Sequence, residues 1–210
     1  MRNASTIVTF EKISAASRRP VPWKNRGGVT REIAMQAPAH PAVPDEFDWR
    51  VSVAEIDQPG PFSTFERVDR ILVMTRGEQM VLRHGDALER LACWQPFEFA
   101  GETPVTAHLP TGPTRDFNLM VRRDYGRGVV HVYHASQQLA IATGVALFYC
   151  AAGAFAIGAV GDDDPPVMLE EGDTLRVDLD ARMVFELRPA VANSTLIDAR
   201  IEPGAAQSRG

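Results

Sequence analysis

The sequence predicts an all-β fold, either a sandwich or a barrel, and two observations support this prediction. Apolar or alternating segments of four to six residues recur along the chain and are bounded by Gly, Pro or Asp, which is typical of strands separated by tight turns. No segment keeps an apolar period of about 3.6 residues over several turns, as a packed amphipathic helix requires. Strands are therefore favoured throughout the chain.

The expected strands follow one another from the first third of the chain onward. They are residues 49–54, 71–74, 79–82, 146–150, 174–177 and 183–187. Residues 139–146 are rich in alanine and could form a helix, but the apolar face of that helix would be poor. Residues 36–46 carry three prolines and are expected to form a surface loop. Residues 161–166 are expected to form a solvated turn, and residues 202–210 to fray.

An internal repeat appears when the sequence is shifted by 76 positions. Gly77 then aligns with Gly153, Gly85 with Gly161, and the strand at 71–74 with residues 147–150. Turns and apolar runs stay in step without gaps, although identities are sparse. The sequence therefore predicts two similar β modules, residues 1–125 and 126–210, packed as one compact unit.

Composition argues against several classes of function. The net charge is −5 and no dense run of Lys and Arg occurs, so nucleic acid is not an expected partner. No apolar run approaches the roughly 20 residues of a membrane span, so no membrane association is expected. No signal-peptide pattern opens the sequence, and we expect a cytoplasmic location.

The two modules, with Leu169–Leu175 in the second, resemble the cupin superfamily of small β-barrels. Most cupin enzymes hold a metal through the patterns G-x5-H-x-H-x4-E-x6-G and P-x-G-x2-H. Anchored at Gly77, these patterns place Ser63 and Phe65 at two His positions and Arg70 at the Glu position, and Arg115 takes the last His position. No metal and no cofactor are therefore expected. Arginine at two ligand positions favours an anion instead.

A more specific resemblance rests on five groups of residues that occur in order between residues 20 and 125. They are Trp23-Lys24-Asn25-x-Gly27-Gly28-x-Thr30-Arg31-Glu32-Ile33, Asp48-Trp49-Arg50-x-Ser52-x-Ala54, Gly60-Pro61-Phe62-Ser63-x-Phe65, Asp69-Arg70, and Arg115-Asp116-Phe117-Asn118-Leu119-Met120 followed by Arg122-Arg123. Together these motifs resemble the HutD/Ves family. The family usually has glycine where Arg26 stands here.

The resemblance implies a bicupin, with two jelly-roll (double-stranded β-helix) barrels in one chain that lack the usual metal ligands. It also implies a non-catalytic protein that binds a carboxylated metabolite such as formylglutamate and modulates histidine utilisation or a stress response. The predicted ligand-binding residues are Lys24, Asn25, Thr30, Glu32, Arg50, Ser52, Ser63, Asp69, Arg70, Arg115, Asp116 and Asn118.

Strand alternation leaves part of this site open. Asp116, Asn118 and Met120 share one face of their strand, whereas the cupin register turns Arg115 inward. A slip of one residue would exchange inside for outside. Near the first motif, Trp23 could line a pocket or pack in the core. Asn25 could bind an anion or form an Asx turn.

Three functional interpretations remain open at this stage. The leading one is a small-molecule sensor or regulator whose ligand is a small anionic metabolite. The alternative is a metal-free cupin enzyme, an isomerase or lyase acting on a sugar or amino-acid derivative, with Glu32, Asp69 or Asp116 as its general base. A structural role through homodimerisation at an edge strand is compatible with both.

Overall fold

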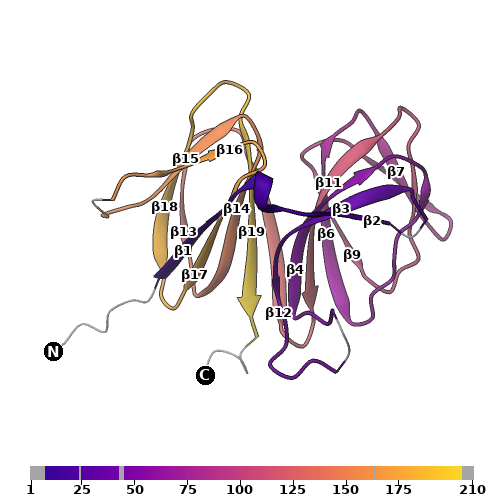
Figure 1. Cartoon of the computed structure of the whole chain (residues 1–210), viewed down its shortest axis with the longest axis horizontal. Helices are drawn as coiled ribbons and strands as arrows, with labels where there is room; N and C mark the ends of the chain where they lie inside the picture. Colours follow the sequence, from indigo (N-terminus) through magenta and orange to yellow (C-terminus); the bar gives the residue numbers. More distant parts are fainter. Residues whose placement is uncertain (1–7, 24, 43–44, 163, 205–210) are drawn as a thin grey trace. The chain divides into compact units, whose positions relative to one another are not determined.

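A computed structural model of the chain describes residues 8–23, 25–42, 45–162 and 164–204 (Figure 1). Lys24, one of the predicted ligand-binding residues, lies outside the described residues. Within them, the regular structure is β-strand apart from one 3-10 turn at Ala15–Ser17. The all-β prediction is confirmed, and residues 139–146 form strand and turn rather than helix.

The described residues form two compact units. The first unit comprises Arg18–Gly128 together with residues 203 and 204, and the second comprises residues 8–17 with Val129–Glu202. These units differ from the predicted modules at the start of the chain, because Val8–Ile13 pairs with Thr174–Leu179 in the second unit. Sequence proximity could not reveal that pairing, since more than 150 residues separate the two strands.

The first unit consists of two antiparallel sheets. Their strands are β2 (Pro20–Pro22), β3 (Gly28–Gln36), β4 (Trp49–Ile56), β5 (Gly60–Pro61), β6 (Val68–Arg76), β7 (Met80–His84), β8 (Ala87–Leu91), β9 (Pro96–Ala100), β10 (Thr106–His108) and β11 (Thr114–Arg122). In the described chain, the larger sheet has the order β2-β3-β4-β11-β6-β9 and the smaller one β5-β10-β7-β8. Leu72 and Met74 of the larger sheet pack against Met80 and Leu82 of the smaller one in a single apolar cluster.

The second unit is also a pair of antiparallel sheets. Its strands are β1 (Val8–Ile13), β12 (Gly126–Tyr133), β13 (Gln137–Ile141), β14 (Gly144–Ala152), β15 (Ala154–Ala159), β16 (Val167–Glu170), β17 (Thr174–Leu179), β18 (Met183–Pro189) and β19 (Thr195–Pro203). The described sheets have the orders β1-β17-β14-β19-β12 and β13-β18-β15-β16. Phe148, Phe155 and Phe185 are fully buried between them. Apolar side chains therefore fill the interior of this unit.

The register of β11 decides which side chains of the first unit face inward. Asp116 pairs with Ala54 of β4 and with Met74 of β6, and both neighbours belong to the apolar cluster. Asp116, Asn118 and Met120 therefore face the interior, and Arg115 faces the opposite side. The inward placement of Arg115 was wrong. The ladder of β11 with β4 is continuous from Thr114 to Val121, so the alternation along β11 is unbroken. The shift in its pairing with β6 leaves the extra residue, Thr75, on β6.

Candidate ligand-binding pocket

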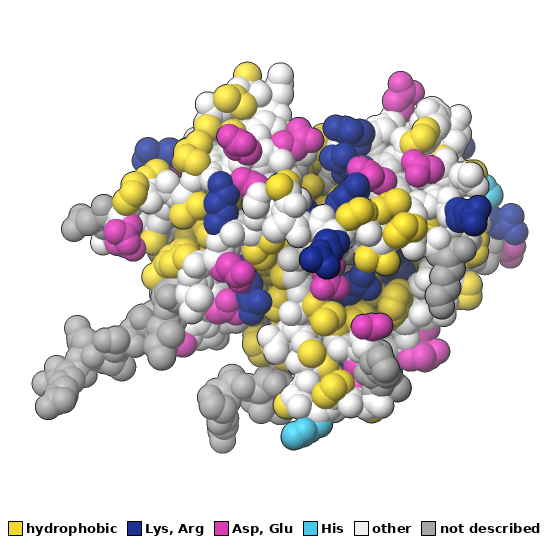
Figure 2. Space-filling model, viewed as in Figure 1, with side chains coloured by type: hydrophobic (Ala, Val, Ile, Leu, Met, Phe, Trp, Pro, Cys, Tyr) yellow, Lys and Arg dark blue, Asp and Glu magenta, His cyan; other side chains and the backbone are white. Residues whose placement is uncertain are grey.

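A pocket of about 570 Å³ opens on the inner face of the six-stranded sheet of the first unit. Its volume lies in the range that holds small organic ligands. Figure 2 shows Lys and Arg side chains beside apolar ones over the region where β2, β3 and β4 lie in Figure 1. The lining residues are Val21, Pro22, Trp23, Asn25, Thr30, Arg50, Ser52, Ala54, Pro61, Phe62, Ser63, Phe65, Arg70, Asp116, Asn118 and Met120.

Three rows of inward-facing side chains form the floor of this pocket. The rows run across the strands because residues paired in a sheet share a face. The first row joins Arg50, Met120 and Arg70, the second joins Ser52 and Asn118, and the third joins Thr30, Ala54 and Asp116. The guanidinium groups thus belong to one end of the strand face and the Asp116 carboxyl to the other.

The segment that contains Phe62, Ser63 and Phe65 forms one wall. Its backbone is fixed by hydrogen bonds from Phe62 N to Val105 O at 2.8 Å and from Phe65 N to Gly101 O at 2.9 Å. The second contact requires glycine, because a Cβ at Gly101 would lie only 2.6 Å from the Phe65 carbonyl oxygen. The sheet and this wall therefore hold the aromatic rings over the polar floor.

Arg70 is the most constrained charged group in the pocket. Its side chain is only 6% exposed, its Nη1 donates to Ser63 O at 3.1 Å, and its guanidinium lies over Phe99 at 4.8 Å from the ring centroid. Burial lowers the pKa of Arg70 to about 10, and the Asp116 carboxyl opposes part of that shift. Among the described residues, no carboxylate forms an ion pair with Arg70. A bound anion would supply the negative charge that pairs with the Arg70 guanidinium.

Asp116 and Asn118 are the buried hydrogen-bonding groups of the floor, with exposures of 1% and 7%. Within the described part of the chain, the Oδ1 atom of each has no hydrogen-bond donor. Burial raises the pKa of Asp116 to about 7, and the Arg70 guanidinium offsets part of this rise. The carboxyl therefore changes its protonation state near neutral pH.

We expect this titration to appear in the stability of the protein. The pKa of Asp116 rises from 3.8 to about 7 on folding, so the folded state binds the proton more tightly. The contribution of the protonated carboxyl to the free energy of unfolding is fully present below about pH 4 and is lost as pH rises through about 7. In Asp116→Asn the free energy of unfolding should not show this decrease, which is on the order of 2–4 kcal/mol at pH 8.

The measurement is urea unfolding of Asp116→Asn and the unchanged protein at pH 4.5 and pH 8. Asp69→Asn, on the opposite face of the same sheet, is the matched control. A difference between Asp116→Asn and the unchanged protein that does not grow with pH would refute the assignment.

Several pocket residues are held by contacts with one another. Trp23 Nε1 donates to Thr30 Oγ1 at 2.8 Å, while its ring packs on the apolar cluster. The two interpretations of Trp23, as pocket wall and as core, thus both apply. Asn25 Oδ1 accepts from Gly27 N at 2.9 Å and forms the Asx turn. Arg26 follows with a φ of 58°, a conformation that glycine adopts without strain and that fits the glycine expected at this position from the resemblance.

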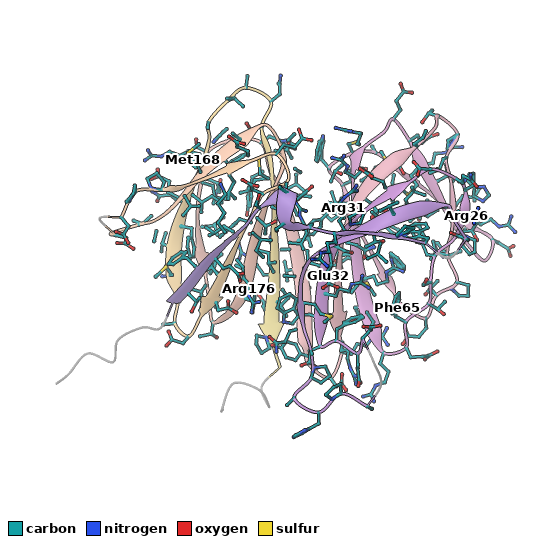
Figure 3. The ribbon with its side chains drawn as sticks, viewed as in Figure 1. Arg26, Arg31, Glu32, Phe65, Met168 and Arg176 are labelled. Carbon is teal, nitrogen blue, oxygen red and sulfur yellow. The ribbon has the colours of Figure 1, made fainter. Side chains whose placement is uncertain are left out.

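The structure brings together eight of the predicted ligand-binding residues in this pocket. They are Asn25, Thr30, Arg50, Ser52, Ser63, Arg70, Asp116 and Asn118. Glu32 is exposed and forms an ion pair with Arg50 at 3.0 Å. Arg31 and Glu32, which follow one another on β3, are labelled in Figure 3 together with Phe65 of the first unit. Because Glu32 is not among the lining residues, it compensates the charge of Arg50 from outside the pocket.

Two of the predicted residues point away from the pocket. Arg115 donates to Glu55 at 3.1 Å, and Arg31 donates to the same carboxylate at 2.8 Å. These hydrogen bonds, led by that from Arg31, lower the pKa of Glu55. Asp69 lies on the same outer side, where it pairs with Arg123 at 2.7 Å and lines a separate hollow of about 300 Å³. Neither residue can reach a ligand in the pocket from this position.

The aromatic and apolar walls of the pocket were not among the ligand-binding residues predicted from sequence. Phe62, Phe65 and Met120 all line the pocket. A signal was present, since all three belong to the family motifs. Apolar residues carry no chemical pattern of their own, and whether they line a pocket or fill a core depends on the packing of loops that sequence does not specify.

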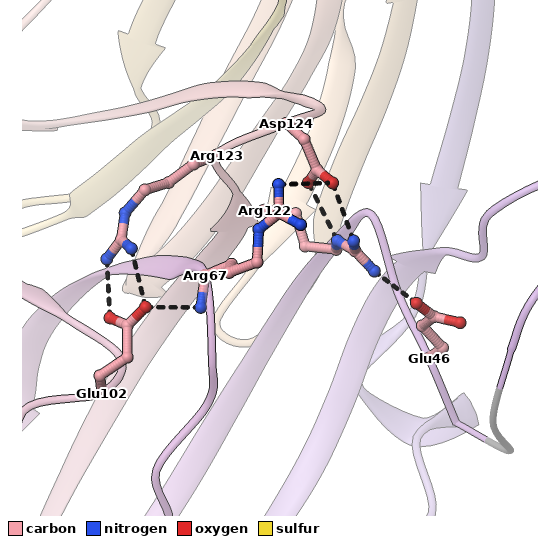
Figure 4. A network of polar contacts seen from close by, with 6 residues as sticks. All are labelled: Glu46, Arg67, Glu102, Arg122, Arg123 and Asp124. Atoms are coloured by element: carbon pink, nitrogen blue, oxygen red, sulfur yellow. Dashed lines mark hydrogen bonds and ion pairs between the residues drawn. The ribbon is translucent and has the colours of Figure 1, made fainter.

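A surface network of ion pairs holds the pocket wall from outside (Figure 4). Arg123 donates to both oxygens of Glu102 at 2.7 and 2.8 Å, and Glu102 accepts from the backbone N–H of Arg67. The hydrogen bonds from Arg123 lower the pKa of Glu102 to about 2, and the bonds from the backbone add to this effect. Arg122 contacts Asp124 and Glu46 in the same network. The Arg122-Arg123 motif therefore fastens the end of β11 to the loop before β6.

We expect Arg123→Gln to loosen that loop without unfolding the protein, because Glu102 would lose the partner that keeps it against Arg67 N. Amide hydrogen exchange at Phe65 and Arg67 should accelerate severalfold at low salt. Arg188→Gln, which removes an exposed pair with Glu186 in the second unit, is the control. Unchanged exchange at both amides would show that the network does not hold the wall.

The described residues contain no cluster of three or more His, Cys, Asp or Glu side chains able to hold a metal ion. Ser63, Phe65 and Arg70, which the cupin sequence pattern places at metal-ligand positions, line the pocket, and a guanidinium disfavours a cation beside it. In the part of the chain that the structure describes, no helix has the length and hydrophobicity needed to cross a bilayer.

The paired antiparallel sheets and the pocket on their inner face define a cupin-like β-protein. The fold resembles that of a cupin 2 conserved barrel domain protein from Leptotrichia buccalis with a TM-score of 0.53, 10% identity, and coverage of 88% of this chain and 96% of that chain. The HutD family matches residues 15–194. The chain therefore belongs to the HutD family.

Individual relatives agree with this assignment. The chain is 41% identical over 112 residues to Protein Ves from Cronobacter sakazakii, covering 52% of this chain and 59% of that protein. The match therefore spans little more than half of the Ves protein. The chain is also 32% identical over 142 residues to an uncharacterized 21.2 kDa protein in the hutC 3′ region of Pseudomonas putida, covering 67% of this chain and 73% of that protein.

Solved structures also resemble most of the chain, and two of them are similar in sequence as well. One is a conserved protein of unknown function from Pseudomonas aeruginosa, with a TM-score of 0.84, 25% identity, and coverage of 94% of this chain and 100% of that chain. The other is HutD from Pseudomonas fluorescens, with a TM-score of 0.77, 28% identity, and coverage of 92% of this chain and 100% of that chain.

Proposed function

We propose that the chain binds a small carboxylated metabolite in the first-unit pocket and acts as a non-catalytic regulator. The observation that carries this proposal is Arg70, a buried guanidinium that lines the pocket and has no ion-pair partner among the described residues. A buried charge is costly unless it is paired, and a carboxylate matches the planar donors of a guanidinium. Arg50 supplies a second guanidinium in the same row.

The family relationship suggests which metabolite to test first. A relative is named for the hutC region and another is named HutD, which supports a role in histidine utilisation. Formylglutamate is our candidate ligand, and binding it would let the protein respond to flux through that route. A stress response is a second setting for the same binding activity.

The cytoplasmic location and a homodimer remain predictions, and sedimentation would test the latter.

Calorimetric titration of the folded protein tests the proposal. Formylglutamate and related dicarboxylates should bind at one site per chain, and affinity should fall as ionic strength rises because the contact is charged. The neutral diamide of glutarate, which has similar size and no carboxylate, is the control ligand. Absence of heat across the dicarboxylate panel, with the protein folded by circular dichroism, would contradict the proposal.

One observation favours a second candidate function. Asp116 is buried in the pocket and its pKa of about 7 is suited to general acid–base catalysis at neutral pH. A metal-free isomerase or lyase would use this carboxyl to move a proton on the bound acid. Exchange of solvent deuterium into bound metabolites, lost in Asp116→Asn, would establish that activity. A metabolite that binds tightly and exchanges no carbon-bound proton would exclude it for that metabolite.

A further inference from the structure

The polar groups of the pocket are divided into two ends of different chemistry. Arg50 and Arg70 belong to the row at one end, while Asn118 and Asp116 belong to the next two rows along β11. Side chains two residues apart on a strand are about 7 Å apart along its axis. A ligand anchored at the guanidinium groups would therefore place its other end, a few bonds away, against Asn118, and a longer ligand would reach Asp116, about 14 Å along the strand from the arginine row.

The second end consists of hydrogen-bond acceptors that lack donors. Asp116 and Asn118 are both more than nine-tenths buried and line the pocket. Among the described residues, no donor reaches the Oδ1 atom of either side chain. Buried polar atoms in proteins are almost always hydrogen-bonded. Two unsatisfied acceptors side by side on adjacent rows therefore indicate a complementary donor on the ligand.

We propose that the ligand carries, besides its carboxylate, a neutral hydrogen-bond donor that Asn118 accepts, with Asp116 available to a further donor on a longer ligand. The donor is a hydroxyl or an amide N–H located a few bonds from the carboxylate. This inference rests on the proposed binding of a carboxylated metabolite and specifies its chemical class. It separates hydroxy acids and N-acyl amino acids from acids with an apolar tail or a free ammonium group.

The charges around the pocket decide between a neutral donor and an ammonium group. Among the residues that the structure describes, two guanidinium groups line the pocket, and Glu32 forms its ion pair with Arg50, from outside the lining. Burial disfavours the ionised form of Asp116, whose pKa is about 7. An ammonium at this end would be a third cation near Arg70, and its counter-ion would be a carboxyl that burial keeps partly protonated. A neutral donor binds either protonation state, because a carboxyl oxygen accepts in both.

Three acids of nearly equal shape provide the test: hexanoate, δ-hydroxyvalerate and δ-aminovalerate. They present a methyl, a hydroxyl and an ammonium group at the same distance from the carboxylate. Titration of the full chain at pH 7 should give the tightest binding for δ-hydroxyvalerate, with roughly tenfold weaker binding for the other two. In Asn118→Leu the preference for hydroxyl over methyl should disappear, while Arg115→Met, on the opposite face of the same strand, should keep it.

The outcomes separate this inference from the function on which it rests. Binding of all three acids with equal affinity, or tightest binding of δ-aminovalerate, would overturn the neutral-donor inference and leave carboxylate binding intact. Equal preference in Asn118→Leu and the unchanged protein would overturn the role of Asn118. If none of the acids, formylglutamate included, binds the folded protein, the proposed function fails together with the inference.

Discussion

Arg70→Met is expected to abolish binding of the carboxylated ligand while leaving the protein folded. The methionine would occupy the space between Phe62, Phe65 and Phe99, which now surround the guanidinium. Loss of a buried charged contact to a ligand typically costs about 2–5 kcal/mol, so affinity should fall at least roughly 30-fold. Stability should be unchanged or higher, because replacing an unpaired buried charge with an apolar side chain removes a desolvation cost.

Arg115→Met is the matched control for this experiment. Arg115 is on the opposite face of the same sheet and contacts Glu55, which keeps Arg31 as a partner after the substitution. Its loss should leave ligand affinity within about twofold, because side chains on opposite faces of a strand do not share a pocket. Calorimetric titration of both variants measures their ligand affinities. A large loss of affinity in Arg115→Met, with none in Arg70→Met, would restore the inward register of Arg115.

Gly28→Ala should cost at least about 2 kcal/mol of folding free energy. A Cβ at this position would lie 2.4 Å from the Glu55 carbonyl oxygen and 3.3 Å from the Trp23 ring. The carbonyl belongs to β4 in the middle of the sheet, so β3 would have to move away from it. That movement would also displace Trp23, whose backbone N–H donates to Gly28 O at 2.9 Å. Ligand binding should therefore weaken together with stability.

Gly27→Ala supplies the comparison for Gly28→Ala within the same pair of glycines. The nearest atoms that a Cβ at Gly27 would meet in the described chain belong to the Asn25 side chain, at 3.3 Å, and a side chain can move aside where a backbone carbonyl cannot. We expect a cost below about 1 kcal/mol. Urea unfolding of both variants measures the difference. Equal losses of unfolding free energy in Gly27→Ala and Gly28→Ala would show that both glycines are needed for the turn, and that the close approach of Gly28 to Glu55 is not the cause.

The fold class could be predicted from sequence because it follows from local patterns. Alternation in β4 and short apolar runs in β6 and β14 identify strands without any knowledge of their partners. The pairing of β1 with β17 is different, since it depends on contacts between distant segments. No local sequence pattern predicts which strand will pair with residues 8–13.

The candidate site was partly predictable for a related reason. Residue type marked Arg70, Asp116 and Asn118 as candidates, and strand alternation placed the latter two on one face. Alternation defines the two faces of a strand but does not identify which of them is buried. In the structure the partners of Asp116 on β4 and β6, Ala54 and Met74, belong to the apolar cluster. The sequence does not show which distant strands pair with β11 or which face they bury. Counting positions along a cupin pattern turned Arg115 inward, so both Arg115 and Asp116 were predicted to bind the ligand, although only Asp116 lines the pocket.

A crystal structure of the protein grown with saturating formylglutamate tests the proposed binding site most directly. We expect one ligand in the first-unit pocket, with a carboxylate against the guanidinium groups of Arg70 and Arg50 and the formamide N–H toward Asn118 and Asp116. An empty pocket with the ligand bound elsewhere, or a metal ion coordinated in its place, would contradict the proposed function.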